Sequence, residues 1–303
     1  MKARYSRKYL REGQGVSAYT ILANHIPLQC ELIGTHEHES YFVFDIWYNN
    51  SSEITPEVIT GDMHSINKAN FAILNWFDVQ LKPRFTSLND QLKNLYCGND
   101  IKEYANFLIK PIAQIDRQVI VEQKNNIDQL VVTLALKEMN QANLIKKLCH
   151  LPPENKLRKA VFEHDKLIRS IYTLKYMMDS KLQRDVHKSQ NRIESYHQLR
   201  AAIAKVGGKK QLYGKTDIDV EISNQCGRLV ASAIIYYNST ILSGLLDKYE
   251  NLTNNKKFLT TMKKISPVAW YHHIHFLGQY TFQNKSYNID INKILETIDF
   301  NFV

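Results

Sequence analysis

Short apolar stretches and turns alternate through the first ninety residues, in a pattern typical of a mixed fold. The stretches rich in β-branched and aromatic residues predict strands, and those with apolar residues at helical spacing predict helices. The dipeptide Asn24-His25 separates the first two strands, which predicts a hairpin. The predicted strands are residues 16–23, 26–33, 56–62 and 79–85, and the predicted helices are residues 36–48 and 67–77. This order of strands and helices indicates the α/β class.

From about residue 100 onward, apolar residues recur every three or four positions, which predicts helices. Ile127, Leu130, Val131 and Leu134 are an example, since they lie at i, i+3, i+4 and i+7. A long helix is expected after a Pro-Pro break, and others are expected over residues 189–206, 219–249 and 266–278. Ser266-Pro267 is a favourable start for the last of these. We expect these helices to pack on the α/β part.

Charge and composition narrow the class of protein only modestly. The chain holds 39 Lys and Arg against 30 Asp and Glu, a net charge of +9. That surplus fits a nucleic-acid partner, because basic side chains neutralise phosphates, and it also fits a merely soluble basic protein. The four cysteines are far apart, which argues against a disulfide framework or a zinc ribbon. No run approaches the 18 apolar residues of a membrane span, and no secretory signal is visible, so we expect a cytoplasmic protein without a membrane partner.

Two histidine-rich stretches resemble metal sites without completing a known motif. Residues 36–39 read His-Glu-His-Glu, but position 40 is serine, so the HExxH pattern is broken. We interpret this stretch as an acidic, solvated helix start. His272 and His275 share one face of a predicted helix, which we interpret as packing on the core. The sequence contains no phosphate-binding glycine loop and no nucleophile elbow.

Two carboxylates stand out from the rest. Asp62 ends an apolar predicted strand, the position where α/β sites form. Glu194 lies on a predicted helix beside the basic residues Lys188, Arg192 and Arg200. A strand-end Asp and a helix Glu that face each other could hold a hard divalent cation through oxygen ligands. The alternative is a capping Asp and a solvated Glu.

Three separated stretches carry a resemblance to a known family. They are residues 3–85, with Ala-Arg-Tyr-Ser at 3–6 and Lys-Pro-Arg-Phe at 82–85; residues 191–238, with Asn-Arg-Ile-Glu-Ser-Tyr-His at 191–197 and Asn-Gln-Cys-Gly-Arg-Leu-Val at 224–230; and residues 265–282. In this order they resemble the C-terminal catalytic region of transposases from the Tn-three family of replicative transposons. The resemblance covers nearly the whole chain.

The resemblance implies a ribonuclease H-like fold with an Asp-Asp-Glu active site. The second Asp of the family falls on Asp62 and its Glu falls on Glu194. The family chemistry uses two magnesium ions, one to activate the attacking water or 3′-hydroxyl and one to stabilise the leaving oxygen. In the family the first Asp lies on a central strand upstream of Ala3, and we expect residues 1–303 to lack a counterpart of that strand. Gly61, Met63, Ser65 and Ile193 also depart from the family pattern around the two acids.

The expected organisation is therefore one transposase catalytic domain over residues 1–303. Its parts are a strand-rich core at 1–90, a large all-helical insertion at 100–185 and C-terminal helices at 186–303 that return to the core. The strands at 16–23 and 58–62 should flank the position of the first, missing strand and leave unpaired edges there. His64, Arg192, Arg200 and Lys188 are expected to contact DNA.

The functional expectation is metal-dependent DNA cleavage and strand transfer, by a domain that is a truncated remnant and inactive on its own. The absence of the first Asp should also weaken magnesium binding. Alternatives are a non-catalytic DNA-binding regulator that pairs with an intact transposase, and a helical scaffold. The expected partners are transposon-end DNA and a second transposase copy, in the bacterial cytoplasm and on the nucleoid when DNA is bound.

Overall fold

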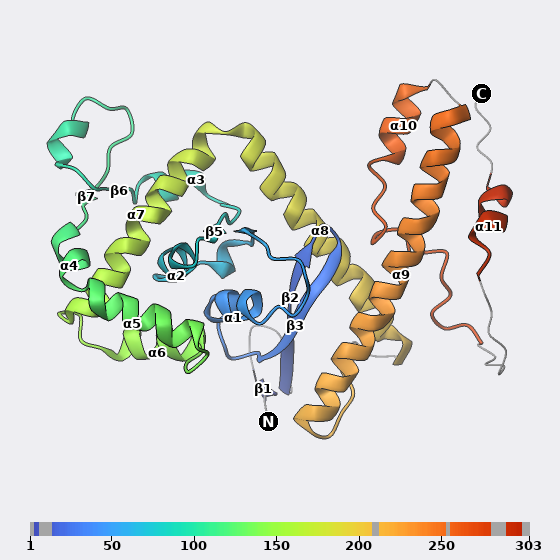
Figure 1. Cartoon of the computed structure of the whole chain (residues 1–303), viewed down its shortest axis with the longest axis horizontal. Coiled ribbons are helices and arrows are strands. Elements are labelled where there is room, and N and C mark those ends of the chain that lie inside the picture. The colour runs from blue at the N-terminus through green and yellow to red at the C-terminus, as the bar shows by residue number, and fades with distance from the viewer. Residues whose placement is uncertain (1–2, 6–13, 208–211, 253–254, 280–288, 299–303) are drawn as a thin grey trace. The chain divides into compact units, whose positions relative to one another are not determined.

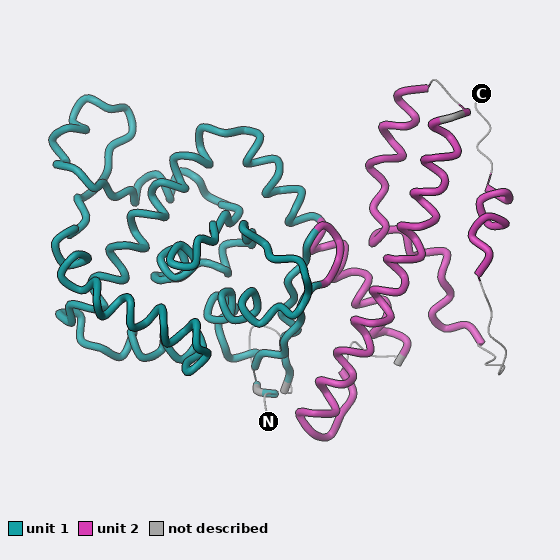
Figure 2. The backbone as a smooth tube through the Cα atoms, viewed as in Figure 1, with its two compact units in different colours: residues 1–23, 28–191 teal, residues 24–27, 192–303 magenta. Residues whose placement is uncertain are grey.

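The structure is a computed structural model that describes residues 3–5, 14–207, 212–252, 255–279 and 289–298 (Figure 1). It is a mixed α/β chain with small sheets and long helices, as predicted. Two compact units can be distinguished: unit 1 comprises residues 1–23 and 28–191, and unit 2 comprises residues 24–27 and 192–303 (Figure 2).

The described strands form three small sheets. They are β1 (Arg4–Tyr5), β2 (Gln14–Ala23), β3 (Ile26–Gly34), β4 (Val58–Ile59), β5 (Gln80–Leu81), β6 (Tyr96–Cys97) and β7 (Ala113–Gln114). β1, β2 and β3 are neighbours in that order, whereas β4 with β5 and β6 with β7 form parallel pairs. Asn24 and His25 have φ angles of 50° and 86°, and positive φ at both central residues is the conformation that a tight two-residue hairpin turn requires. The predicted hairpin is confirmed.

The helical segments of residues 39–204 are mostly short, and two are long. They are η1 (Glu39–Phe42), α1 (Val43–Tyr48), η2 (Met63–Ser65), α2 (Asn70–Trp76), α3 (Leu88–Leu92), η3 (Ile101–Tyr104), α4 (Arg117–Glu122), α5 (Lys124–Ala135), α6 (Gln141–His150), α7 (Lys156–Met178) and α8 (Ser180–Ala204). The first predicted helix begins later than expected, at Glu39, because the His38 ring nitrogen accepts the Ser40 N–H and caps the turn.

One hydrophobic core joins the α/β part of unit 1 to its helices. Phe44 and Phe71, from α1 and α2, belong to the same buried cluster as Leu144 and Val161, from α6 and α7. Helix α7 packs against both α2 and α4. The expectation that these helices pack on the α/β part is confirmed within unit 1. Burial of this kind stabilises the fold by about 25 cal/mol per Å² of apolar surface.

Unit 2 is built around one long helix. Its helical segments are η4 (Lys205–Gly207), α9 (Asp217–Leu252), α10 (Lys256–Met262) and α11 (Ile291–Thr297), together with the end of α8. Ile241, Leu245 and Tyr249 of α9 form a buried cluster that α10 and α11 cover. Among the described residues, the stretch Asp217–Glu250 is long enough to cross a membrane and contains an 18-residue window with a mean hydropathy of 1.5. A core helix of a soluble protein passes the same test, so this feature is weak evidence for a membrane span.

The predicted helix at 266–278 is wrong. After one turn closed by the Trp270 N–H on the Ser266 carbonyl, the segment consists of isolated turns. The buried amide of Asn238 on α9 donates to the carbonyl oxygens of Pro267 (2.8 Å) and Trp270 (2.6 Å). These two bonds tie the segment to α9, so contacts with a distant helix contribute to its conformation.

The short strands β6 and β7 were not predicted, because the segment after residue 100 was expected to be helical. The Ile112 N–H donates to the Leu95 carbonyl (2.8 Å) and the Ile115 N–H donates to the Cys97 carbonyl (2.9 Å). Leu95, Cys97 and Ile115 are all buried. Two-residue strands of this kind leave too short a pattern to be recognised in the sequence.

Candidate functional site

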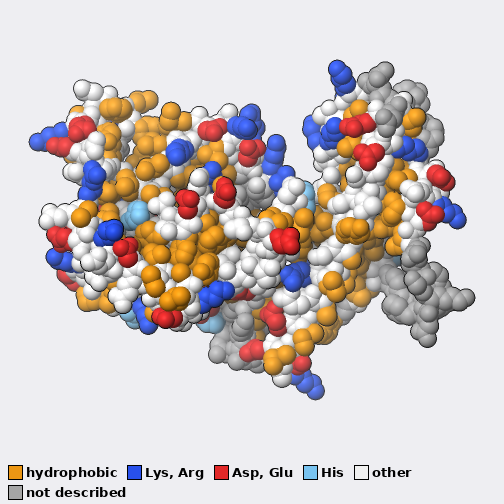
Figure 3. Space-filling model, viewed as in Figure 1, with side chains coloured by type: hydrophobic (Ala, Val, Ile, Leu, Met, Phe, Trp, Pro, Cys, Tyr) orange, Lys and Arg blue, Asp and Glu red, His pale blue; other side chains and the backbone are white. Residues whose placement is uncertain are grey.

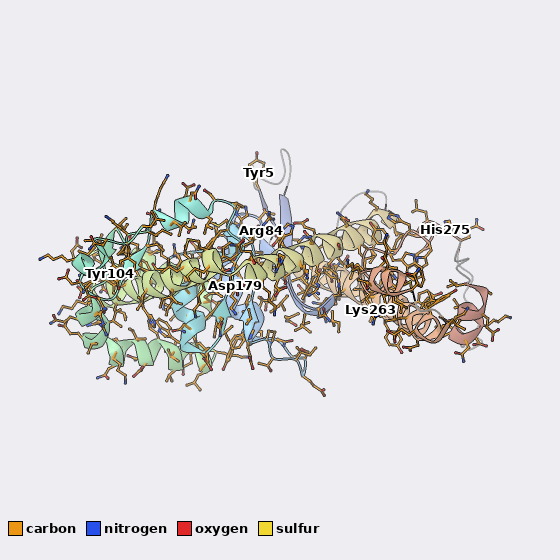
Figure 4. All side chains as sticks on the ribbon, turned by 90° about the horizontal axis from the view of Figure 1, so that it is seen from above. Tyr5, Arg84, Tyr104, Asp179, Lys263 and His275 are labelled. Carbon is orange, nitrogen blue, oxygen red and sulfur yellow. The ribbon has the colours of Figure 1, made fainter. Side chains whose placement is uncertain are left out.

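Asp62 follows directly on a parallel ladder of backbone hydrogen bonds that continues beyond β4 and β5. The N–H groups of Gln80, Lys82 and Arg84 donate in turn to the carbonyl oxygens of Glu57, Ile59 and Gly61, at 2.9, 2.8 and 2.7 Å. Arg84, labelled in Figure 4, is therefore held beside the residue that precedes Asp62. The ladder places Asp62 at a strand end, as predicted, although the regular strand is only two residues long.

The Asp62 carboxylate caps the short helix that follows it. Its Oδ1 accepts the His64 N–H at 2.9 Å, and its backbone carbonyl accepts the Ser65 hydroxyl at 2.6 Å. Gly61 is needed for this turn, because a Cβ at that position would lie 2.7 Å from Ser65 Oγ. The capping interpretation of Asp62 is thus correct, and the half-buried carboxylate keeps a second oxygen for another ligand.

A buried amide network holds this turn in place. Asn70 is fully buried and donates to the carbonyl oxygens of Ser40 (2.8 Å) and Ser65 (2.7 Å). Its own Oδ1 accepts from the Asn67 amide (2.7 Å) and from the Gln141 amide (2.5 Å). Buried polar groups that are all satisfied make a local conformation specific, so the network fixes the position of the Asp62 turn.

A second carboxylate, Glu39, lies near the same tyrosine, Tyr19, as Asp62. Burial raises the pKa of Tyr19 well above its usual value, and the charges of Glu39 and Asp62 raise it further. Tyr19, Glu39 and Asp62 therefore share one neighbourhood within unit 1. The rings of His38 and His64 lie nearby, with centroids 6.5 Å apart, and His64 is exposed. Two neighbouring carboxylates are groups that a cation can bind.

Asp45 is a second buried carboxylate, but it serves the fold. Its Oδ1 accepts the Gln141 N–H at 2.8 Å and its Oδ2 accepts the Ala142 N–H at 3.4 Å, at the first turn of α6. Burial raises the pKa of the Asp45 carboxyl from 3.8 to about 6, against the lowering effect of these two hydrogen bonds. Asp45 therefore supports the helix start rather than a ligand site.

Glu194 and the predicted basic residues lie along α8, in different settings. Glu194 is exposed and belongs to unit 2, whereas Asp62 belongs to unit 1. Lys188 is exposed and lies 4.0 Å from the Asp185 carboxylate. Burial lowers the pKa of His25, and the charge of Arg192 lowers it further, so these two residues lie close together.

Arg200 makes contacts inside unit 2. Its guanidinium donates to the carbonyl oxygen (3.2 Å) and Oδ1 (2.9 Å) of Asn224, and to the Tyr196 hydroxyl (3.3 Å). Gly227 lets the guanidinium approach α9, since a Cβ there would lie 3.2 Å from it. These bonds join α8 to α9, so Arg200 has a structural partner in addition to any role with DNA.

The residues present do not complete a metal site. Within the described ranges, no three His, Cys, Asp or Glu side chains are grouped so that they could hold an ion. Asp62 offers one oxygen beyond its capping bond, and magnesium usually takes one or two carboxylates with several waters. The described part of unit 1 therefore shows Asp62 without a group of three metal ligands around it.

The sequence patterns missed Asn70, Gln141 and Arg84 as parts of this site. Asn70 stands at the start of an apolar run, and a polar residue in such a place is a signal of buried hydrogen bonding. Gln141 lies 71 residues away from Asn70 along the chain, and no local pattern links the two. Arg84 is found through its backbone pairing, which the sequence does not reveal.

Comparisons with known proteins agree on one family. The sequence matches the Tn3 transposase DDE domain over residues 1–280. It is 23% identical over 281 residues to the transposase for transposon Tn1546 of Enterococcus faecium, covering 90% of this chain and 27% of that protein. It is 23% identical over 287 residues to the transposase for transposon Tn2501 of Escherichia coli, covering 91% of this chain and 28% of that protein. The chain thus spans little more than a quarter of the length of these relatives.

Proposed function

The chain belongs to the Tn3 transposase DDE domain family, and we propose that it supplies the strand-cleavage and strand-transfer part of DNA transposition. The observation that carries this proposal is the extent of the match, which runs through both Asp62 and Glu194. The two named relatives are transposases, and each is more than three times as long as this chain. The activity of the whole protein is therefore part of the proposal.

Asp62 and Glu194 are proposed as two acids of one active centre. The strand-end position of Asp62, the rigid network beneath it and the nearby carboxylate of Glu39 support its role. Glu194 is exposed on the long helix α8 and falls on the Glu of the family motif. His64, Lys188, Arg192 and Arg200 are proposed to contact the DNA backbone. Magnesium is the proposed cofactor. Asp62 would supply one of its ligands in unit 1, and the other protein ligands would come from outside that unit.

The proposed fold is ribonuclease H-like, in a single catalytic domain over residues 1–303. An antiparallel hairpin followed by the parallel pair β4 and β5 supports it. Arg4 pairs with Gly15 and Tyr5 with Gln14. Among the described residues, β1 therefore pairs with only the first two residues of β2. β2 and β4 lie in separate sheets. This is the arrangement expected if a further strand belongs between residues 16–23 and 58–62.

The proposed partner is transposon-end DNA in the bacterial cytoplasm, with self-association or pairing with an intact transposase. The basic surplus is not gathered in one patch on the face shown in Figure 3, where acidic and basic side chains are interspersed. We expect DNA binding that is weak and falls as salt rises, because contacts between basic side chains and phosphates release counterions.

One specific observation favours a second function, a non-catalytic regulator that binds DNA or an intact transposase. It is the departure of Met63, Ser65 and Ile193 from the family pattern beside the two acids. The test is incubation of the purified polypeptide with labelled transposon-end duplex, with and without magnesium. We expect binding that falls steeply as salt rises, and no nicking by residues 1–303 alone.

If the unaltered chain nicks DNA, and Asp62→Ala and Glu194→Ala each abolish the nicking, the chain contains a complete set of catalytic acids. Glu39 is the first candidate for the third acid in that case, because it shares the neighbourhood of Tyr19 with Asp62. Binding that ignores salt would contradict both functions and favour the scaffold alternative.

A further inference from the structure

A pocket along α7 has side chains that the proposed active centre does not use. The α7 pocket, as we call it, has a volume of about 530 Å³, within the usual range for ligand sites. Most of its lining residues come from α7, the loop before α2 and the segment from α3 to β6. Helices α2 and α3 and strand β6 contact α7, and Figure 1 shows these elements. The pocket lining includes Lys68, Tyr96, Arg158, Phe162, Lys166 and Arg169. All belong to unit 1.

The α7 pocket carries a surplus of positive charge. Its lining includes five basic side chains, and the two acids Glu163 and Asp165. Lys166 pairs with Glu163 at 2.7 Å, and Lys159 pairs with Asp116 at 2.6 Å. Asp165 is itself buried and pairs with Arg169 at 2.5 Å. Counting Asp116, five cations face three anions, and the surplus of two lies on Lys68 and Arg158.

These two cations have donors to spare. Arg158 donates one N–H to the Leu151 carbonyl, and a guanidinium has five such donors. Lys68 is exposed, and among the described residues it has no carboxylate within ion-pair distance. Cations that are held at a pocket and lack an acidic partner are the groups that bind phosphates.

Aromatic side chains lie between the cations. The Arg158 guanidinium lies over the Phe162 ring at 5.5 Å, and the Lys166 ammonium lies over the Tyr96 ring at 4.7 Å. The Tyr96 backbone is fixed, because its N–H donates to the Ser170 hydroxyl at 2.9 Å. Bases of single strands stack on aromatic rings and on guanidinium planes, while cations in the same groove follow the phosphates.

We propose that the α7 pocket binds a single-stranded DNA segment, with phosphates on Lys68 and Arg158 and a base stacked at Tyr96 or on the Arg158–Phe162 pair. A duplex keeps its bases paired inside the helix, so it cannot use the aromatic part of this pocket. This inference rests on the proposed function, because strand transfer creates unpaired DNA ends that need a place on the protein.

Hydrogen bonds link the α7 pocket to the turn that holds Asp62. Arg169 donates to the Asn67 carbonyl at 2.7 Å, and Asn67 belongs to the network that fixes the turn. Asp165 accepts the Phe71 N–H at 2.9 Å at the start of α2. Lys68 lies 68 − 62 = 6 residues after Asp62. A strand held in the pocket would therefore lie against the same loop that carries the catalytic acid.

The test is fluorescence anisotropy of the full chain with labelled oligothymidylate, over a series of salt concentrations. Tyr96→Ala should weaken binding about five- to 150-fold, the effect of losing one stacked base. Lys68→Ala should weaken binding and reduce the slope of log affinity against log salt by about 0.7, the value for one phosphate contact on a single strand. Matched controls outside the pocket are Tyr104→Ala and Lys93→Ala, which should change neither quantity.

Photocrosslinking of a bromodeoxyuridine-substituted oligonucleotide gives a second readout that does not depend on a variant folding. We expect crosslinked peptides that contain Tyr96 or Phe162. Crosslinks confined to other peptides, affinity unchanged in Lys68→Ala, or duplex bound as tightly with the same dependence on Tyr96 would overturn the proposal. Competition by thymidine monophosphate at equal concentration would overturn it in favour of a free nucleotide.

Failure of the proposed function is distinguishable from failure of this inference. If Asp62 and Glu194 do not form an active centre, metal binding at Asp62 will be absent while oligothymidylate binding persists. If the pocket does not bind DNA, metal binding at Asp62 will persist while the Lys68 and Tyr96 variants bind like the unaltered chain.

Discussion

Replacement of Asp45 by asparagine should remove a specific pH dependence from the stability of unit 1. The carboxyl is buried, and burial raises its pKa from 3.8 to about 6. A raised pKa means that the folded state binds the proton more tightly than the unfolded state. The stabilisation is complete below about pH 4 and is lost as the pH rises through about 6. A difference of about 2 pKa units corresponds to roughly 3 kcal/mol.

Asp45→Asn cannot titrate, so the difference between its free energy of unfolding and that of the unaltered chain should depend on pH. Relative to the unaltered chain, the variant should gain roughly 3 kcal/mol between pH 4 and pH 7. Its amide oxygen can still accept the Gln141 N–H, while the weaker bond from Ala142 is lost, which adds a constant offset.

The assay is urea unfolding followed by tryptophan fluorescence at a series of pH values. Trp47 and Trp76 report on unit 1, and Trp270→Phe removes the tryptophan of unit 2. Asp128→Asn, an exposed carboxylate in an i,i+4 pair with Lys124, is the matched control and should show no such trend. A stability difference for Asp45→Asn that stays constant from pH 4 to pH 7 would show that the folded state does not hold the Asp45 proton more tightly.

Two further substitutions test local packing. Gly61→Ala should destabilise unit 1 by about 1–3 kcal/mol, because its Cβ would meet Ser65 Oγ at 2.7 Å. In urea titrations, the double variant with Ser65→Gly should recover most of that loss. If it recovers none, the contact with Ser65 is not the cause. Asn238→Ala should destabilise unit 2 by roughly 1–3 kcal/mol, because the Pro267 and Trp270 carbonyls lose their donor. Thermal melting followed by Trp270 fluorescence measures this loss, with Thr240→Ala as the control. Equal melting temperatures for the two variants would contradict the prediction.

Local signals in the sequence were enough to predict some elements and not others. The hairpin around Asn24-His25 was predictable because its turn residues tolerate positive φ and its strands have strong β propensity. Asp62 was predictable as an acid at a strand end, because a short apolar stretch that predicts a strand precedes it. The family was recognised from separated motifs in order, and the match over residues 1–280 confirms it.

The elements that were missed depend on contacts between distant residues. Ser266-Pro267 is a good helix start, yet the segment that follows is tied to α9 by the bonds from Asn238 to the Pro267 and Trp270 carbonyls. The amide network joins Asn70 to Gln141 across 71 residues. Arg200 was selected for its charge, but its partners Tyr196 and Asn224 come from packing of α8 on α9. Each of these features is decided by tertiary structure, which overrides local preference.

Iron-directed cleavage of the polypeptide can decide whether Asp62 and Glu194 belong to one metal-binding active centre. Fe²⁺ takes oxygen ligands and, with ascorbate and peroxide, generates radicals that cut the chain close to the bound ion. We predict cuts near both residue 62 and residue 194, suppressed by excess magnesium and lost in Asp62→Ala and in Glu194→Ala. Cuts near only one of the two residues, or cuts that neither substitution changes, would contradict a shared centre.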